Sequence, residues 1–169
     1  MSSQAIKQAL EGFVDVLRNK PETGRAPRTA TVRVSQGTLC EIDVDGHKLL
    51  SDTPNVLGGQ NKAPTPGALL RASLGSCLAM SYVGWAARLG VPVEHVEVVI
   101  EGDFDPRGAL GAAEVVPVEY GAFRYKALIK SPASRERVQE VFETANKHST
   151  VLQTISRAIP VNGEWQAAS

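Results

Sequence analysis

Apolar positions repeat with helical spacing near the start of the chain. In residues 3–19 they recur every three or four positions, which places them on one face of a helix. Pro21 stops this helix, and a run containing proline and glycine follows it as a linker. We expect the helix to be an arm that packs on another part of the fold or on a second subunit.

The most apolar segment of the chain is residues 66–89. Arg71 is its only charged side chain between positions 68 and 87, and small residues are frequent there. Thr65 is a suitable N-cap and Pro66 a suitable first helical residue. The length would fit a membrane span, but the arginine, the small residues and the lack of a second span favour a core helix. We predict a central helix that is buried on nearly all sides.

Alternating apolar and polar residues predict strands in much of the remaining chain. The predicted strands cover residues 29–35, 38–44, 47–51, 93–104, 123–130 and 159–166. Short turns, among them the tight-turn signal Asp45-Gly46, join the first three strands into an antiparallel meander. An amphipathic helix follows Ser131-Pro132, and a short helix is expected at 151–158. Because strands and helices do not alternate regularly, the pattern favours an α+β fold over a doubly wound parallel sheet.

Composition and charge narrow the class of protein. The 169 residues, 43% hydrophobic and 21% charged, are typical of a globular protein with one sizeable core. Eighteen basic residues balance eighteen acidic ones without any basic run, so we expect no nucleic-acid partner. The first seven residues lack the pattern of a secretory signal, and two cysteines are no disulfide framework. We therefore expect a cytoplasmic protein with free thiols and no membrane partner.

The two cysteines are the candidate reactive groups. Cys77 lies in the middle of the apolar helix, where mainly apolar neighbours disfavour a charged thiolate. It is either an inert core thiol or a reactive one that a cation or donor from another segment activates. Cys40 shares a predicted strand face with Ile42 and Val44 and is expected to be structural, although a disulfide with Cys77 stays open. The three histidines show no metal-ligand spacing, so we expect neither a metal nor a cofactor.

Several short runs around the apolar helix together form a family motif. They are Leu57-Gly58-Gly59, Pro64-Thr65-Pro66-Gly67-Ala68-Leu69-Leu70, Ala72-Ser73-Leu74-Gly75-Ser76-Cys77-Leu78-Ala79-Met80 and, downstream, Ala145-Asn146-Lys147-His148-Ser149-Thr150-Val151. The chain resembles the OsmC/Ohr family, the osmotically induced and organic hydroperoxide resistance proteins, over roughly residues 29–166. The resemblance implies an intertwined homodimer in which antiparallel sheets wrap long central helices. It also divides the chain into an N-terminal helix and linker arm, residues 1–28, and an OsmC-like domain, residues 29–169.

The same resemblance implies a chemistry and the residues that carry it. Enzymes of the family reduce organic hydroperoxides with a thiolate, and a second cysteine then condenses with the sulfenic acid formed. Cys77 matches the attacking cysteine. Ser149 stands at the position of the second cysteine and Gly67 at the position of a glutamate that helps to hold the thiolate. Arg33 is a nearby candidate to replace the family arginine as activator.

Two functional hypotheses follow from this pattern. In the first, the protein is a thiol-dependent hydroperoxide reductase of altered type that acts through Cys77. Its oxidised sulfur would then be resolved by Cys40, by an external thiol or by nothing. In the second, the protein is a non-catalytic dimer that keeps the fold and binds a small apolar ligand at the interface between subunits.

Overall fold

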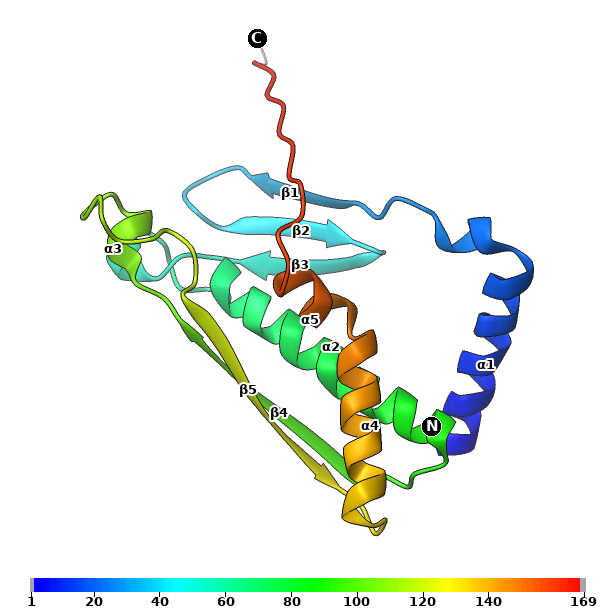
Figure 1. Cartoon of the computed structure of the whole chain (residues 1–169). Helices are drawn as coiled ribbons and strands as arrows, with labels where there is room; N and C mark the ends of the chain where they lie inside the picture. The colour runs from blue at the N-terminus through cyan, green and yellow to red at the C-terminus, as the bar shows by residue number, and fades with distance from the viewer. Residues whose placement is uncertain (1, 168–169) are drawn as a thin grey trace.

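The computed structural model describes residues 2–167, and its elements alternate between small sheets and helices (Figure 1). The helices are α1 (Ser3–Asn19), α2 (Pro66–Leu89), α3 (Pro106–Ala109), α4 (Arg135–His148) and α5 (Thr150–Ile155). The strands are β1 (Ala30–Val34), β2 (Cys40–Val44), β3 (His47–Ser51), β4 (His95–Asp103) and β5 (Ala122–Lys130). Short 3₁₀ turns, η1 (Pro21–Gly24) and η2 (Asn55–Leu57), complete the set.

Both sheets are antiparallel, which confirms the predicted α+β class. Strands β1, β2 and β3 form a meander in that order. Asp45 and Gly46 join β2 to β3 with backbone φ angles of 47° and 79°, the left-handed geometry that a two-residue hairpin turn requires. Strands β4 and β5 pair along nine residues from His95↔Lys130 onward. In Figure 1 the meander and the β4–β5 pair lie on opposite sides of α2.

Helix α2 is the centre of the fold, and its ends have the predicted chemistry. The Thr65 side chain accepts a hydrogen bond from the Ala68 N–H at 3.2 Å, and Pro66 occupies the first helical position. Gly90 ends the helix in the left-handed conformation, with a φ of 67°. The sequence bounds of this helix were therefore correct.

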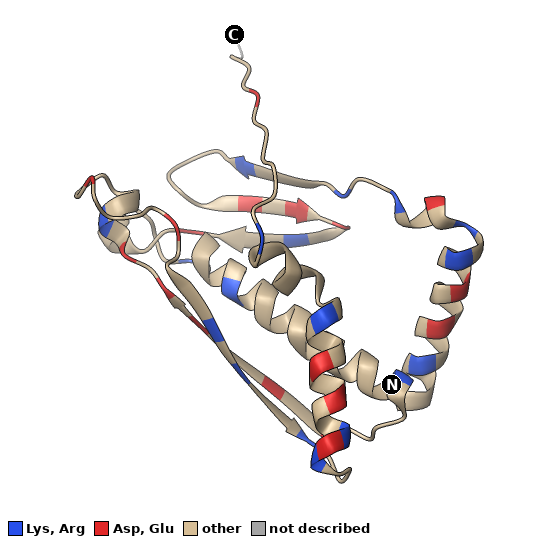
Figure 2. Ribbon diagram, viewed as in Figure 1, with Lys and Arg blue, Asp and Glu red and all other residues tan. Residues whose placement is uncertain are grey.

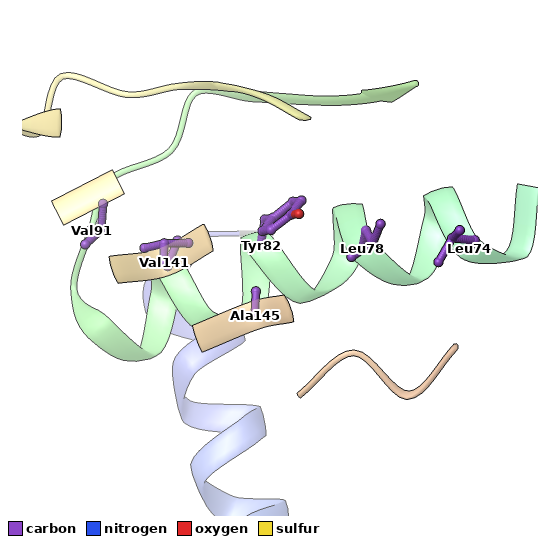
Figure 3. Close-up of a cluster of buried hydrophobic side chains, with 7 residues drawn as sticks. Leu74, Leu78, Tyr82, Val91, Val141 and Ala145 are labelled. Atoms are coloured by element: carbon purple, nitrogen blue, oxygen red, sulfur yellow. The ribbon is translucent and has the colours of Figure 1, made fainter. Parts of the chain in front are cut away.

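One stripe of α2 forms the hydrophobic core with α4 (Figure 3). Leu74, Leu78 and Tyr82 recur every four residues and are almost completely buried. They pack with Val141 and Ala145 of α4, which are also fully buried. The inner faces of β4 and β5 pack against this cluster and close the core.

The prediction that α2 is buried on nearly all sides is wrong within the single chain. Met80, on another face of the helix, is 68% exposed. Helix α2 nevertheless carries charge only at Arg71 and Arg88, whereas α1 and α4 carry charges of both signs (Figure 2). The meander also has an uncovered apolar face, on which Val32 and Val34 are each about half exposed. Two apolar surfaces of the chain are thus left uncovered by its own residues.

The predicted last strand, residues 159–166, is wrong. This segment is irregular, and its apolar side chains Val161 and Trp165 are 87% and 90% exposed. No described strand lies beside it to supply the hydrogen bonds that a strand needs. Residue 1 and residues 168–169, at the two ends of the predicted arm and domain, lie outside the described residues.

The loop between β3 and α2 is organised by a single buried carboxylate. Asp52 is 2% exposed. It accepts hydrogen bonds from the Thr38 hydroxyl at 2.8 Å and from the backbone N–H groups of Thr53, Gln60 and Lys62 at 2.8–3.1 Å. This carboxylate therefore fixes the segment that leads into α2.

The N-terminal arm packs on α2 of its own chain. Glu11 of α1 accepts a hydrogen bond from Arg88 of α2 at 2.9 Å. No residue of α1 is fully buried, so the contact is a surface one. No helix among residues 2–167 is long and apolar enough to cross a bilayer.

Candidate functional site

Cys77 and Ser149 lie in contact where α2 meets the junction between α4 and α5. Cys77 Sγ, midway along α2, is 3.3 Å from the hydroxyl oxygen of Ser149. Ser149 separates α4 from α5 in an extended conformation, with φ and ψ of −76° and 109°. Its side chain is completely buried, whereas Cys77 is half-buried. The fold thus brings the candidate nucleophile and the position predicted for a second cysteine to within one contact distance.

A second polar contact fixes α4 against α2 beside this pair. The buried Tyr82 hydroxyl donates a hydrogen bond to Asn146 Oδ1 at 2.8 Å. Burial raises the pKa of Tyr82 well above its usual value, so this donor keeps its proton. Asn146 lies one turn before Ser149, which ties the placement of the Ser149 hydroxyl to the packing of the core.

Cys77 lines a cavity of about 290 Å³ on a second stripe of α2. The stripe follows helical spacing, because the cavity residues of α2 lie three, four, seven, eight and eleven positions after the cysteine. The remaining wall comes from α1. The lining consists of Leu10, Cys77, Met80, Ser81, Gly84, Trp85 and Arg88. The thiol therefore lies at one end of a mainly apolar hollow.

The other end of the cavity holds an aromatic and cationic cluster. The Arg88 guanidinium lies 4.3 Å from the Trp85 ring centre, a cation–π distance. Trp85 also stacks on His148 with ring centres 4.7 Å apart. Arg88 is eleven residues from Cys77 along α2, a rise of about 16 Å. The guanidinium is also paired with the Glu11 carboxylate at 2.9 Å, and among the hydrogen bonds of residues 2–167 it makes none to the sulfur.

Gly67 lies near the start of α2, nearly three turns before Cys77, and faces Tyr120. A Cβ atom at Gly67 would lie 2.4 Å from the Tyr120 hydroxyl oxygen. That hydroxyl accepts a hydrogen bond from Arg71 at 2.9 Å. The tyrosine thus fills the space that a longer side chain at position 67 would need.

Arg33 is engaged away from the thiol. Its guanidinium lies 2.6 Å from Asp43 on the exposed polar face of the meander. Hydrogen bonds from Lys48 and then from Arg33 hold the pKa of Asp43 below its usual value, so the carboxylate stays charged. Among the hydrogen bonds of residues 2–167, the partner of Cys77 is the neutral Ser149, and no arginine or lysine bonds to the sulfur.

Cys40 is a free thiol and forms no disulfide with Cys77. It lies on β2 and donates a weak hydrogen bond to the Thr38 carbonyl at 3.7 Å. The disulfide that the sequence left open is therefore not made in this structure.

Several residues of the site were missed by the sequence analysis. Leu10 was included only among the apolar positions of residues 3–19, and Trp85 only as part of the apolar segment 66–89. Helical spacing could have grouped Trp85 and Arg88 with Cys77 on one stripe, because they lie eight and eleven positions further along the helix. The pairing of Trp85 with His148 depends on tertiary packing, which no local pattern reports.

Comparisons with known proteins match the sequence of this chain to one family and its fold to solved structures. A family model described as OsmC-like protein matches residues 59–164. No curated protein matches the chain significantly. The fold is similar to that of an OsmC-like protein from Mycoplasma pneumoniae, with a TM-score of 0.66 and 15% identity over 78% of this chain and 89% of that one.

Two further solved structures have a similar fold. An organic hydroperoxide resistance protein OsmC from Legionella pneumophila has a TM-score of 0.55 and 18% identity over 78% of this chain and 90% of that one. An OsmC-like protein of unknown function from Vibrio cholerae has a TM-score of 0.58 and 14% identity over 76% and 93%. Because the family model matches more than half of the residues, this chain belongs to the OsmC-like family.

Proposed function

We propose that the protein reduces organic hydroperoxides with Cys77 as the nucleophile. The observation that carries the proposal is the place of Cys77, half-buried on the wall of an apolar cavity with the Ser149 hydroxyl 3.3 Å from its sulfur. Membership of the OsmC-like family supports it, as does the name of the Legionella pneumophila structure, an organic hydroperoxide resistance protein.

The first step oxidises the sulfur. The Cys77 thiolate attacks the terminal oxygen of the hydroperoxide, an S–O bond forms and the O–O bond breaks. The leaving alkoxide takes a proton and departs as an alcohol, while the cysteine becomes a sulfenic acid. The apolar lining of the cavity suits the organic part of the substrate.

Ser149 supports this step with its hydroxyl. A buried serine hydroxyl can donate a hydrogen bond to the thiolate or to the oxygen of the sulfenic acid. Such a charge-assisted hydrogen bond is about twice as strong as a neutral one, so it can orient the attacking sulfur. Serine cannot form a disulfide, and this difference changes the second half of the cycle.

Recycling then needs an external thiol of low molecular weight. One thiol condenses with the sulfenic acid to give a mixed disulfide and water. A second thiol attacks the outer sulfur of that mixed disulfide, which releases the Cys77 thiolate and leaves the two external thiols joined as a disulfide. Two thiols are therefore consumed for each hydroperoxide reduced.

We also propose that the active form is a homodimer. The exposed face of the meander is apolar, with Val32 55% and Val34 52% exposed. Exposed apolar patches of this kind mark interaction surfaces in soluble proteins. A net charge of zero offers no repulsion between two copies.

The alternative function is binding of a small apolar ligand without catalysis. The neutral partner of Cys77 favours it, because a thiolate is stabilised best by a nearby cation. The cavity beside the thiol would then hold the ligand, and oxidation of Cys77 would be incidental.

Trapping of the sulfenic acid separates the two functions. Reduced protein is mixed with one equivalent of cumene hydroperoxide in the presence of dimedone, and peptides are analysed by mass spectrometry. Catalysis predicts a dimedone adduct on the Cys77 peptide within seconds, retained in Cys40→Ser and lost in Cys77→Ser. Peroxide that persists while Cys77 stays a free thiol would support the binding function instead.

A further inference from the structure

Two cavities meet beneath the N-terminal helix, and Leu10 of α1 belongs to the wall of both. The smaller cavity, about 290 Å³, contains Cys77. The larger one, about 530 Å³, lies between α1, α2 and the start of β4 and is lined mainly by apolar residues. Leu10, Met80 and Gly84 line both cavities. The side chain of Leu10 reaches across from α1, whereas the other two shared residues belong to α2.

The Leu10 side chain packs closely against the backbone of α2 at Gly84. A Cβ atom at Gly84 would lie 3.3 Å from Leu10 Cδ1, so the glycine leaves just enough room for the leucine. The next residue, Glu11, is held by Arg88 at 2.9 Å and fixes this part of α1 on α2. Leu10 is therefore held at the junction of the two cavities.

We propose that Leu10 is a specificity-determining residue that separates the thiol cavity from the larger apolar cavity and so sets the size of the substrate. This inference rests on the proposed function. A cavity of about 290 Å³ is at the lower edge of the range of about 300–1,000 Å³ for drug-sized ligands, so it takes a compact branched or aromatic hydroperoxide. With Leu10 shortened, the larger cavity becomes a continuation that accepts the tail of a long-chain hydroperoxide.

The partition comes from a part of the chain outside the family match. The OsmC-like model matches residues 59–164, and α1 ends at Asn19. The Cys77 side of the site thus lies within the matched region, while one wall of its cavity is supplied by α1, outside that region.

Thiol-reactive probes of different length test the partition without needing catalysis. Methyl and decyl methanethiosulfonate each transfer an S-alkyl group to a cysteine, forming a disulfide and releasing methanesulfinate. The rate of Cys77 modification is followed by mass spectrometry of its peptide, which separates it from Cys40. Leu10→Ala is compared with Val16→Ala, which shortens an exposed apolar residue of α1 that lines neither cavity.

In wild type and in Val16→Ala we expect the methyl reagent to modify Cys77 about tenfold faster than the decyl reagent, or more. In Leu10→Ala that ratio should fall towards one, and in Leu10→Phe, which enlarges the partition, it should rise. Ratios that stay at the wild-type value in both Leu10 variants would overturn the inference. Because the Phe variant adds volume instead of removing it, loss of folding in Leu10→Ala leaves the test intact.

A parallel assay with peroxides keeps this inference separate from the proposed function. Cumene hydroperoxide and a long-chain alkyl hydroperoxide are offered to the same variants. A gain for the long-chain substrate in Leu10→Ala alone supports both ideas. A changed reagent ratio without oxidation of Cys77 by either peroxide supports the partition and overturns the proposed function.

Discussion

Cys77 and Ser149 are 72 positions apart in the sequence, and yet the sulfur and the hydroxyl oxygen are 3.3 Å apart. The contact joins the middle of α2 to the junction between α4 and α5. It gives the thiol a buried, neutral hydrogen-bonding partner, and no second side chain among residues 2–167 bonds to the serine hydroxyl. The reactivity that we propose for Cys77 depends on this pair.

A cysteine at position 149 should restore an internal disulfide. The Ser149→Cys variant is expected to close the 3.3 Å contact to the S–S length of about 2.05 Å when oxidised. The oxidised variant should be lighter by the mass of two hydrogen atoms, and the thiols at positions 77 and 149 should no longer titrate. Stability against unfolding should rise by up to about 4 kcal/mol for a loop of this length in the chain-entropy model. Ser156→Cys, on the exposed end of α5, is the control, and two titratable thiols at 77 and 149 after oxidation would contradict the geometry.

Removal of the Ser149 hydroxyl should slow the chemistry of Cys77. A hydrogen bond to a charged group contributes about 1.5–3 kcal/mol, so Ser149→Ala should lower the rate of Cys77 oxidation about tenfold or more. The measurement is the rate of thiol loss in excess cumene hydroperoxide at fixed pH. Ser81→Ala, which removes a hydroxyl from the same cavity without a bond to the sulfur, should keep the wild-type rate. Equal oxidation rates in wild type, Ser149→Ala and Ser81→Ala would show that the Ser149 hydroxyl does not contribute to the reactivity of Cys77.

Asp52 should make the stability of the protein depend on pH. The Lys62 N–H, followed by the Thr38 hydroxyl and the N–H groups of Gln60 and Thr53, holds the pKa of Asp52 below its usual value. A carboxyl with a lowered pKa in the folded state stabilises the protein above its unfolded pKa of about 3.9, and the contribution is lost as the pH falls through the folded pKa.

Asp52→Asn should therefore lower the melting temperature at pH 7, and the gap to wild type should narrow below about pH 4. Thermal melts across this range provide the measurement. Asp15→Asn, an exposed pair with Arg18, is the control and should leave the melting temperature unchanged. A gap that is the same at pH 7 and at pH 3 would show that the asparagine acts by another route.

The exposed apolar face of the meander should be part of the contact between two copies. A lysine at Val34, which is 52% exposed on that face, would bury a charge in the proposed interface. Light scattering should find wild type at twice its 18.0 kDa chain mass and Val34→Lys at or near the chain mass. Thr31→Lys, on the opposite face of the same strand, should remain dimeric. A wild-type monomer at micromolar concentration would contradict the proposed dimer.

Local signals were enough to predict most of the elements. The bounds of α2 followed from Thr65, Pro66 and Gly90, because capping chemistry is read within a few residues of each end. The turn at Asp45-Gly46 likewise fixed the pairing of β2 with β3.

The errors have a common physical origin in missing partners. Residues 159–166 have the apolar composition of a strand, but a strand forms only where another strand offers its hydrogen bonds. Helix α2 has the composition of a fully buried helix, yet one chain supplies cover for only part of its surface. In both cases the local sequence pattern does not show which other segment would cover or pair with the element.

The candidate site could be predicted only in part. Cys77 was a candidate as one of only two thiols in the sequence, whereas position 149 came from the family resemblance, and nothing in the periodicity links the two. The engagement of Arg33 with Asp43 depends on the register of β1 against β2, which the sequence alone did not fix. The role of Leu10 needed the packing of α1 on α2, because its helical pattern shows an apolar face without showing what it touches.

The most direct test of the central claim is the second-order rate constant for oxidation of Cys77 by cumene hydroperoxide. It is measured from loss of the titratable thiol under excess peroxide, with free cysteine and the Cys77→Ser variant alongside. The account predicts a rate at least about a hundredfold above that of free cysteine, because the hydrogen bond and the cavity are preorganised around the sulfur. A rate equal to that of free cysteine would contradict it.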